Sequence, residues 1–112
     1  MTIFSKIIAG DIPAYKVAEN NEFLAFLDIN PLVEGHVLVI PKDHYPDLAA
    51  LAGAGAGLLD EVAAQAYQVA VAAGVDRTGY RVVFNTGSQA GQTVQHAHAH
   101  VLGGRAMAWP PG

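Results

Sequence analysis

Three of the five histidines in this chain of 112 residues alternate with alanine, in the stretch GQTVQHAHAHVLGG. They are His96, His98 and His100. A period of two is the repeat of a β-strand, on which successive side chains point to opposite faces. The pattern therefore predicts a strand over residues 93–102 with the three imidazoles on one face. Ala97 and Ala99 would lie on the other face, and such small side chains indicate an element packed closely behind, for which a long helix predicted at 58–73 is the candidate.

The remaining pattern predicts an α+β fold. Thr2 can cap a short helix over residues 3–9 that ends at Gly10. We read residues 43–57 as a loop or a frayed first turn, because three glycines weaken a helix there. Further strands are predicted at 14–19, 23–28, 36–40 and 80–85. With the helix at 58–73, this order gives a single domain with a mostly antiparallel sheet.

The composition describes a globular chain with little charge. Hydrophobic residues make up 52% and charged residues 14%, which suits a packed core and not a disordered chain. A chain this small buries surface inefficiently, so the apolar excess indicates either a self-association face or a bias towards alanine. With 6 basic against 10 acidic residues and no Lys/Arg cluster, we do not expect binding to a nucleic acid. Backbone N–H groups can nevertheless hold the phosphate of a single nucleotide.

The chain carries no features of a secreted or membrane protein. There is no cysteine, which excludes disulfides and thiolate metal sites. The first residues, MTIFSKIIAG, lack the organisation of a secretory signal. The longest apolar stretch, residues 62–73, is short and interrupted by glutamine. We therefore expect a cytoplasmic protein that does not insert into a membrane.

Zinc binding is one chemistry open to alternate histidines. On an extended strand, neighbouring members of the set lie roughly 6.6 Å apart and the outer pair roughly 13 Å apart at the backbone. Zinc needs its ligand nitrogens at about 2.0–2.1 Å, so one His-x-His pair can chelate but all three histidines cannot converge. A third ligand would come from His36, His44 or Asp28. Otherwise His36, at a strand start, reads as structural and His44 as solvated, and we expect no resident metal or other cofactor.

Nucleophilic catalysis is the other chemistry that the histidines favour. Imidazole is nucleophilic and largely neutral near pH 7, and neighbouring histidines disfavour each other's cationic form. The preceding loop, residues 87–92, contains glycines and could offer backbone N–H groups to phosphoryl oxygens. Thr93 adds a hydroxyl. The constellation predicts phosphoryl or nucleotidyl transfer without a metal.

At this point the residues resemble a known family. HAHAHV matches the His-φ-His-φ-His-φφ pattern of the histidine-triad (HIT) nucleotide hydrolases and transferases. The segments IFSKIIAGDIPAYKV, FLAFLDINPLVEGHVLVIPKDH and the ending WPPG resemble its histidine-triad nucleotide-binding (HINT) branch. The resemblance covers nearly the whole chain apart from LAALAGAGAG. It implies a single HIT domain over residues 1–112, with a five-stranded sheet, one long and one short helix, and sheets joined across a homodimer.

The resemblance also implies an activity and a role for each site residue. The activity is hydrolysis of purine nucleoside 5′-phosphoramidates, which are amines linked to AMP or GMP, at their P–N bond. Aminoacyl-adenylates would be hydrolysed as well. His98 would be the nucleophile that forms a nucleotidyl-histidine intermediate, His100 would sit at the phosphate, and His96 and His36 would orient the triad. Asp28 would accept the ribose hydroxyls. The base pocket would be lined by Phe4, Ile7, Phe26 and Ile29, and the phosphate and leaving group would be surrounded by Asn85, Gly91, Gln92, Thr93 and Val94.

The tail has no predicted regular structure, but the resemblance gives it a task. Residues 105–112 would contribute to the partner's site, where Trp109 would influence the choice of leaving group. The donor of the proton to the departing amine stays open between His100, Thr93 and the substrate itself. This chain departs from the family pattern at Thr93, where serine is frequent, at Gln95, where an aromatic residue is common, and in the two alanines of the triad.

Two other functions stay open beside the phosphoramidase. The first is hydrolysis of dinucleoside polyphosphates, the activity of another branch of the same superfamily, although the ending LGGR…WPPG favours HINT. The second is a regulatory module that binds a nucleotide and whose catalysis is vestigial. A complete triad speaks against the second, because a binding module has no need of a nucleophile.

Overall fold

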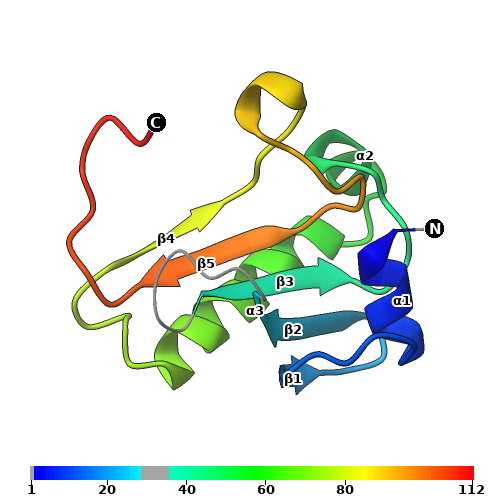
Figure 1. Cartoon of the computed structure of the whole chain (residues 1–112), viewed down its shortest axis with the longest axis horizontal. Coiled ribbons are helices and arrows are strands. Elements are labelled where there is room, and N and C mark those ends of the chain that lie inside the picture. The colour runs from blue at the N-terminus through cyan, green and yellow to red at the C-terminus, as the bar shows by residue number, and fades with distance from the viewer. Residues whose placement is uncertain (1, 29–35) are drawn as a thin grey trace.

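The computed structural model describes residues 2–28 and 36–112 of the chain, and within them one antiparallel sheet carries the fold (Figure 1). Its five strands lie in the order β1-β2-β3-β5-β4, and every neighbouring pair is antiparallel. This confirms the predicted α+β class. The elements are α1 (Ile3–Ala9), β1 (Lys16–Glu19), β2 (Phe23–Leu27), β3 (Val37–Pro41), α2 (Leu48–Gly53), α3 (Leu58–Ala72), β4 (Tyr80–Val83), η1 (Ser88–Ala90) and β5 (Ala99–Gly103).

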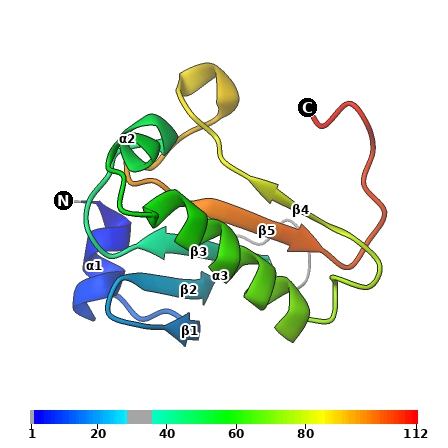
Figure 2. The ribbon, with the colours of Figure 1, turned by 180° about the vertical axis from the view of Figure 1, so that it is seen from behind.

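Strands β2 and β3 are buried on both faces. Figure 2 shows α3 crossing one face of the sheet. Alternate residues of β2 and β3 join the hydrophobic cluster on that side, namely Phe23, Ala25, Val37 and Val39. The residues between them join a second cluster with Phe4 and Ile7 of α1, namely Leu24, Phe26, Leu38 and Ile40. A strand buried on both faces reads as a continuous apolar run, which is the pattern that β2 and β3 have in the sequence.

The predicted cap and stop of the first helix are confirmed. Thr2 caps α1, with its hydroxyl accepting a hydrogen bond from the Ser5 N–H at 3.3 Å. Gly10 follows the helix with a φ of 84°, a conformation that favours glycine. Asn20 closes the turn between β1 and β2, because its Oδ1 accepts from the N–H groups of Glu22 and Phe23, both at 2.8 Å.

The loop predicted over residues 43–57 is wrong in its middle, where α2 forms. Asp47 caps the helix by accepting a hydrogen bond from the Ala50 N–H at 2.9 Å, and Leu51 is buried in the core. Gly53 is the last residue of α2, while Gly55 lies beyond it with a positive φ. The glycines therefore end the helix instead of interrupting it.

The strand predicted over residues 93–102 is also wrong in extent, since β5 begins only at Ala99. Val39 pairs with Ala99, so a continued ladder would place Ala97 opposite Pro41. Pro41 has no N–H to donate. The N–H of Ala97 instead donates to the Tyr45 carbonyl at 2.6 Å, and the chain leaves the sheet.

The packing predicted behind the alanines is confirmed. Ala97 and Ala99 are buried in the same cluster as Ala66 and Ala70 of α3. The helix can pack directly on this segment because both surfaces are made of small side chains.

Among residues 2–28 and 36–112, no helix combines the length and apolar character that a membrane crossing needs.

Gly103, the last residue of β5, is expected to tolerate no larger side chain. A Cβ placed there would meet the Val75 side chain at 2.7–2.9 Å. Gly103→Ala should therefore lower the free energy of unfolding by about 1–3 kcal/mol through overpacking. The control is Gly53→Ala in α2, where a Cβ meets nothing within 4 Å and alanine is expected to be neutral or to stabilise by up to about 1 kcal/mol. Urea unfolding of both variants tests this, and equal stabilities would contradict it.

Candidate functional site

His36, which is remote in the sequence, lies close to the three alternate histidines in the fold. His100 comes from β5, His36 directly precedes β3, and His96 and His98 lie in the segment before β5. The ring centroids are 4.9 Å apart for His98 and His100, and 5.1 Å apart for His36 and His100. His36 and His96 are almost fully buried, with 2% and 1% of their surfaces exposed. The rings of His36, His98 and His100 thus form one cluster, to which His96 is joined through its backbone carbonyl.

The hydrogen bond of His98 sets its tautomer. Its Nδ1 lies 2.7 Å from the backbone carbonyl oxygen of His96. A carbonyl oxygen only accepts, so Nδ1 carries the hydrogen and donates it. In the neutral ring, Nε2 then holds the lone pair. The imidazole is therefore prepared to act as a base or a nucleophile through Nε2.

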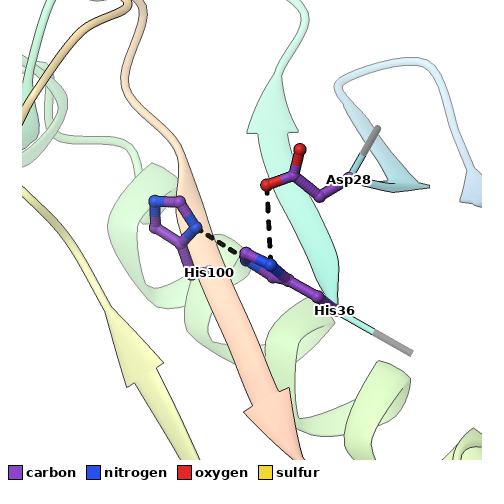
Figure 3. A group of neighbouring side chains, drawn as sticks. All are labelled: Asp28, His36 and His100. Carbon is purple, nitrogen blue, oxygen red and sulfur yellow. Dashed lines mark hydrogen bonds and ion pairs between the residues drawn. The ribbon is translucent and has the colours of Figure 1, made fainter. Parts of the chain in front are cut away.

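A second line of polar groups joins Asp28, His36 and His100 (Figure 3). Asp28 Oδ2 lies 3.5 Å from His36 Nδ1, and His36 Nε2 lies 2.9 Å from His100 Nδ1. The carboxylate favours a hydrogen on His36 Nδ1, so His36 Nε2 accepts from the Nδ1–H of His100. His100 Nε2 is then an acceptor, and Asn85 Nδ2 lies 3.5 Å from it.

Burial favours the neutral form of His36, His96 and His100. It lowers the pKa of His100 to about 4, with further lowering by His98 and His36 and a smaller opposing effect of Asp28. Burial also lowers the pKa of His36, against the Asp28 charge, and the pKa of His96. Repulsion between histidines, predicted from the sequence to favour the neutral form, lowers the pKa of His100 as well, but burial is the larger cause there.

His96 is held by the neighbouring backbone instead of facing its companions. Its Nε2 lies 2.8 Å from the Pro41 carbonyl oxygen, and within the described residues its buried Nδ1 has no hydrogen-bond partner. Its ring also packs edge-on against Phe4 and His44, with centroids 5.8 and 5.3 Å away. These contacts fit the supporting role that the resemblance implies for His96.

His44 is a contributor that the sequence argument missed. Its Nε2 lies 2.7 Å from the carbonyl oxygen of Gln95, the residue directly before the triad. The ring remains exposed, as expected for a polar loop, yet it braces the segment that carries His96. No local sequence signal could reveal this contact, because it depends on how the loop after β3 folds over the segment before β5.

A cavity of about 310 Å³ adjoins the cluster. One side is apolar and formed by α1, β2 and β3, and the other carries a carboxylate, a hydroxyl and two imidazoles. Its lining consists of Ile3, Phe4, Ile7, Phe26, Asp28, Leu38, Thr93, Val94, His98 and His100. Eight of these ten were predicted as site residues. Ile3 and Leu38 were not, although Leu38 shares a strand face with Ile40 against α1; the predicted Ile29 lies outside the described residues.

Gln92 organises the loop that precedes the histidines. Its Oε1 accepts from the Gly87 N–H at 3.0 Å, and its Nε2 donates to the carbonyls of Pro46 and Val94 at 2.8 and 3.1 Å. Gly91 turns the chain with a φ of 82°. The N–H groups of Gly87, Ala90, Gly91 and Gln92 are all engaged within the loop. The loop thereby places Thr93 and Val94 at the cavity. Because these four N–H groups are already engaged, fewer backbone donors of the loop are left for the predicted binding of phosphoryl oxygens.

A second cavity, of about 460 Å³, meets the first at His100. It is lined by Asn85, which the sequence selected, and by the end of the tail of the same chain. The tail thus lies at its own protomer's site, and its contribution to a partner's site stays a prediction. The lining of this cavity consists of Arg81, Val83, Asn85, Gln89, Ala90, His100, Leu102, Pro111 and Gly112. Trp109, the tail residue to which the resemblance gives a role in leaving-group choice, is 81% exposed. His100 therefore stands between an apolar chamber and a chamber bounded by the tail.

The antiparallel sheet, the alternate histidines and the paired cavities define a histidine-triad type of domain. Comparison with known proteins agrees, because the HIT domain family matches residues 9–107. The chain belongs to the HIT domain family.

Individual relatives are similar over almost their whole length. An uncharacterised HIT-like protein of Synechocystis is 47% identical over 99% of this chain and 96% of its own. The 14 kDa zinc-binding protein of Zea mays is 45% identical over 99% of this chain and 88% of its own. The crystal structure of a HIT family hydrolase from Legionella pneumophila covers 100% of both chains, with 44% identity and a TM-score of 0.94.

Proposed function

We propose that this protein is a hydrolase of the HINT branch that cleaves the P–N bond of purine nucleoside 5′-phosphoramidates. It would also hydrolyse aminoacyl-adenylates, in which the acyl group is joined to phosphorus through oxygen. The observation that carries the proposal is His98. It lines the 310 Å³ cavity, and its Nδ1 is committed to the His96 carbonyl, which leaves Nε2 as the reactive nitrogen. The relation to a HIT family hydrolase of known structure supports a hydrolytic activity.

The first cavity suits the nucleoside part of such a substrate. Phe4, Ile7 and Phe26 offer apolar walls to a base. Asp28 lies at the polar side, and a carboxylate has enough acceptor positions to hold His36 and still receive ribose hydroxyls. The phosphorus would then lie near His98 and His100, beside the Thr93 hydroxyl.

The proposed reaction proceeds in two displacements. His98 Nε2 attacks the phosphorus, the P–N bond to the amine breaks, and the amine departs with a proton. Water then attacks the phosphorus of the nucleotidyl-histidine, the bond to His98 breaks, and the nucleoside monophosphate is released. His100, Thr93 and the substrate are the three candidate proton donors. A proton added at His100 Nε2 would be stabilised through His36 and Asp28, which lie in line behind the ring.

The activity is tested by measuring AMP release from adenosine 5′-phosphoramidate and from a diadenosine polyphosphate, each in EDTA. Cleavage of the phosphoramidate alone supports the proposal. Faster cleavage of the polyphosphate would assign the chain to the dinucleoside polyphosphate hydrolases. No cleavage of either, with AMP still bound, would make it a regulatory nucleotide-binding module.

A metal ion is a second candidate ligand beside the nucleotide, and it would be held by Asp28, His36 and His100. The ligand atoms of Asp28, His36 and His100 lie within 4.8 Å of one another, and the similar maize protein is called zinc-binding. Because these residues also line the proposed nucleotide site or support it, zinc and nucleotide would compete. In our proposal the metal is dispensable, so activity in EDTA should equal that of the untreated protein. A loss of activity in EDTA that zinc restores would contradict it.

We also propose that the active protein is a homodimer joined along β4, with the tail 105–112 at the same edge. β4 is an outer strand, and its Val82 is 41% exposed. Tyr67 and Val71 of α3 are exposed as well, at 49% and 40%. The wild type should sediment at twice the chain mass of 11.7 kDa, and Val82→Asp should sediment as a monomer. The matched control is Val17→Asp on β1, the opposite outer strand, where Val17 is 39% exposed. Dissociation of both variants, or of neither, would refute the assignment of the interface to β4.

A further inference from the structure

The C-terminal tail has no helix or strand, yet it is fastened to the sheet. After β5, residues 104–112 lie on the outer, β4 side of the sheet (Figure 1). Arg81 of β4 donates from Nη2 to the Ala108 carbonyl oxygen at 2.6 Å. Its guanidinium also lies over the Trp109 ring, 5.9 Å from the centroid. One side chain thus grips two consecutive residues of a segment that would otherwise be free to move, as chain ends usually are.

The grip depends on properties that arginine has and lysine lacks. The planar guanidinium can donate in its plane to a carbonyl while its face lies on an aromatic ring. A lysine ammonium is a point charge without that geometry. The base of Arg81 is fixed as well, because it pairs with Leu102 in the ladder between β4 and β5. Arg81 therefore fixes the tail relative to the sheet.

The fastened tail forms one wall of the second cavity. Pro111 and Gly112 line the 460 Å³ cavity together with His100 and Asn85. Arg81 lines it too, as does Val83, which lies two residues further along the same face of β4. The distance between the tail and His100 thus depends on where Arg81 holds Ala108 and Trp109.

We propose that Arg81 is a positioning residue that sets leaving-group specificity by holding the tail against the cavity at His100. The inference rests on the proposed function, because the nucleoside fills the first cavity and the leaving group extends into the second. Arg81 acts through the tail and not on the nucleotide. Its loss should alter discrimination between leaving groups and leave AMP binding intact.

The activity experiment compares Arg81→Gln and Arg81→Lys with the control Arg77→Gln, an exposed arginine in the turn before β4. The readout is the ratio of kcat/KM for adenosine phosphoramidates of a bulky aromatic amine and of a small alkyl amine. Losing the grip should change this ratio about fivefold or more in both Arg81 variants, while the Kd for AMP stays within about twofold. Arg77→Gln should change neither. An unchanged ratio in Arg81→Gln would overturn the proposal.

Truncation distinguishes an action through the tail from a direct contact with substrate. Deleting residues 109–112 removes the wall, so it should change the ratio at least as much as Arg81→Gln does. Adding Arg81→Gln to the truncated chain should then have no further effect, because the two changes remove the same device. An additive effect would show that Arg81 acts by another route and would overturn the proposal.

A fluorescence measurement tests the grip without any turnover. Trp109 is the only tryptophan in the sequence, so its steady-state anisotropy reports the mobility of the tail. Arg81→Gln should lower the anisotropy, and Arg77→Gln should not. Unchanged anisotropy in Arg81→Gln overturns the grip itself. Lowered anisotropy in a protein that cleaves no phosphoramidate would instead retain the grip and reject the proposed function.

Discussion

His98→Ala is expected to reduce phosphoramidate turnover by on the order of a thousandfold or more, since it removes the atom that attacks phosphorus. AMP affinity should change little, because the apolar walls of the first cavity and Asp28 remain. Neither His36 nor His100 should replace the lost nucleophile. In our proton assignment His36 Nε2 is occupied by His100, and the substrate would have to shift to reach His100 Nε2.

The measurement pairs single-turnover kinetics with intact-protein mass spectrometry after an acid-free quench. The wild type should gain the mass of one nucleotidyl group during turnover, and His98→Ala should gain none. AMP titration of the variant serves as the control for folding. Turnover of the variant close to that of the wild type would sink the nucleophile assignment, as would a covalent adduct on another residue.

The protein is expected to lose stability as the pH falls from about 6.5 to about 4. In the folded state burial lowers the pKa of His100 from 6.5 to about 4. The unfolded chain therefore binds more protons within this window, and the free energy of unfolding rises with pH there. A shift of that size corresponds to roughly 3 kcal/mol, fully present above pH 6.5 and lost as pH falls towards 4. His36 and His96, whose pKa values are also lowered, act in the same direction.

Urea unfolding at pH 7, 5.5 and 4 measures this dependence. His100→Gln should show a smaller loss between pH 7 and pH 4 than the wild type, because one of the contributing groups is gone. A saturating nucleotide should be left out, since it would add its own linkage. Equal pH dependence in the two proteins would refute the assignment of the effect to His100.

The sequence predicts most of the scaffold because its signals are local. Thr2 and Gly10 bound α1 by capping chemistry that needs no knowledge of the rest of the chain. The alanines between the histidines correctly predict close packing against α3. The glycines of residues 43–57 predict a loop by their number, but they lie at the end of α2 and beyond it. The burial of Leu51, which stabilises α2, depends on the tertiary fold and has no local signal.

The site was predicted by its residue types and not by its geometry. The alternating pattern places His96, His98 and His100 on one strand, but only His100 lies in β5. The bend before Ala99 comes from the partner strand, where Pro41 ends the ladder, and no pattern within residues 93–102 contains that information. The contacts of His44 and Arg81 depend on segments that are remote in sequence and were not predicted for the same reason.

Pro41 affects the placement of the histidines through the backbone of the neighbouring strand. Histidines at alternate positions of a regular strand would all stay in register with the neighbouring strand. Because the amide hydrogen that would extend the ladder does not exist at Pro41, the chain before Ala99 leaves the sheet, and only His100 keeps a place in the ladder. The carbonyl of the same proline receives His96. The departure of His96 and His98 from the sheet thus originates in a hydrogen that one residue of the neighbouring strand lacks.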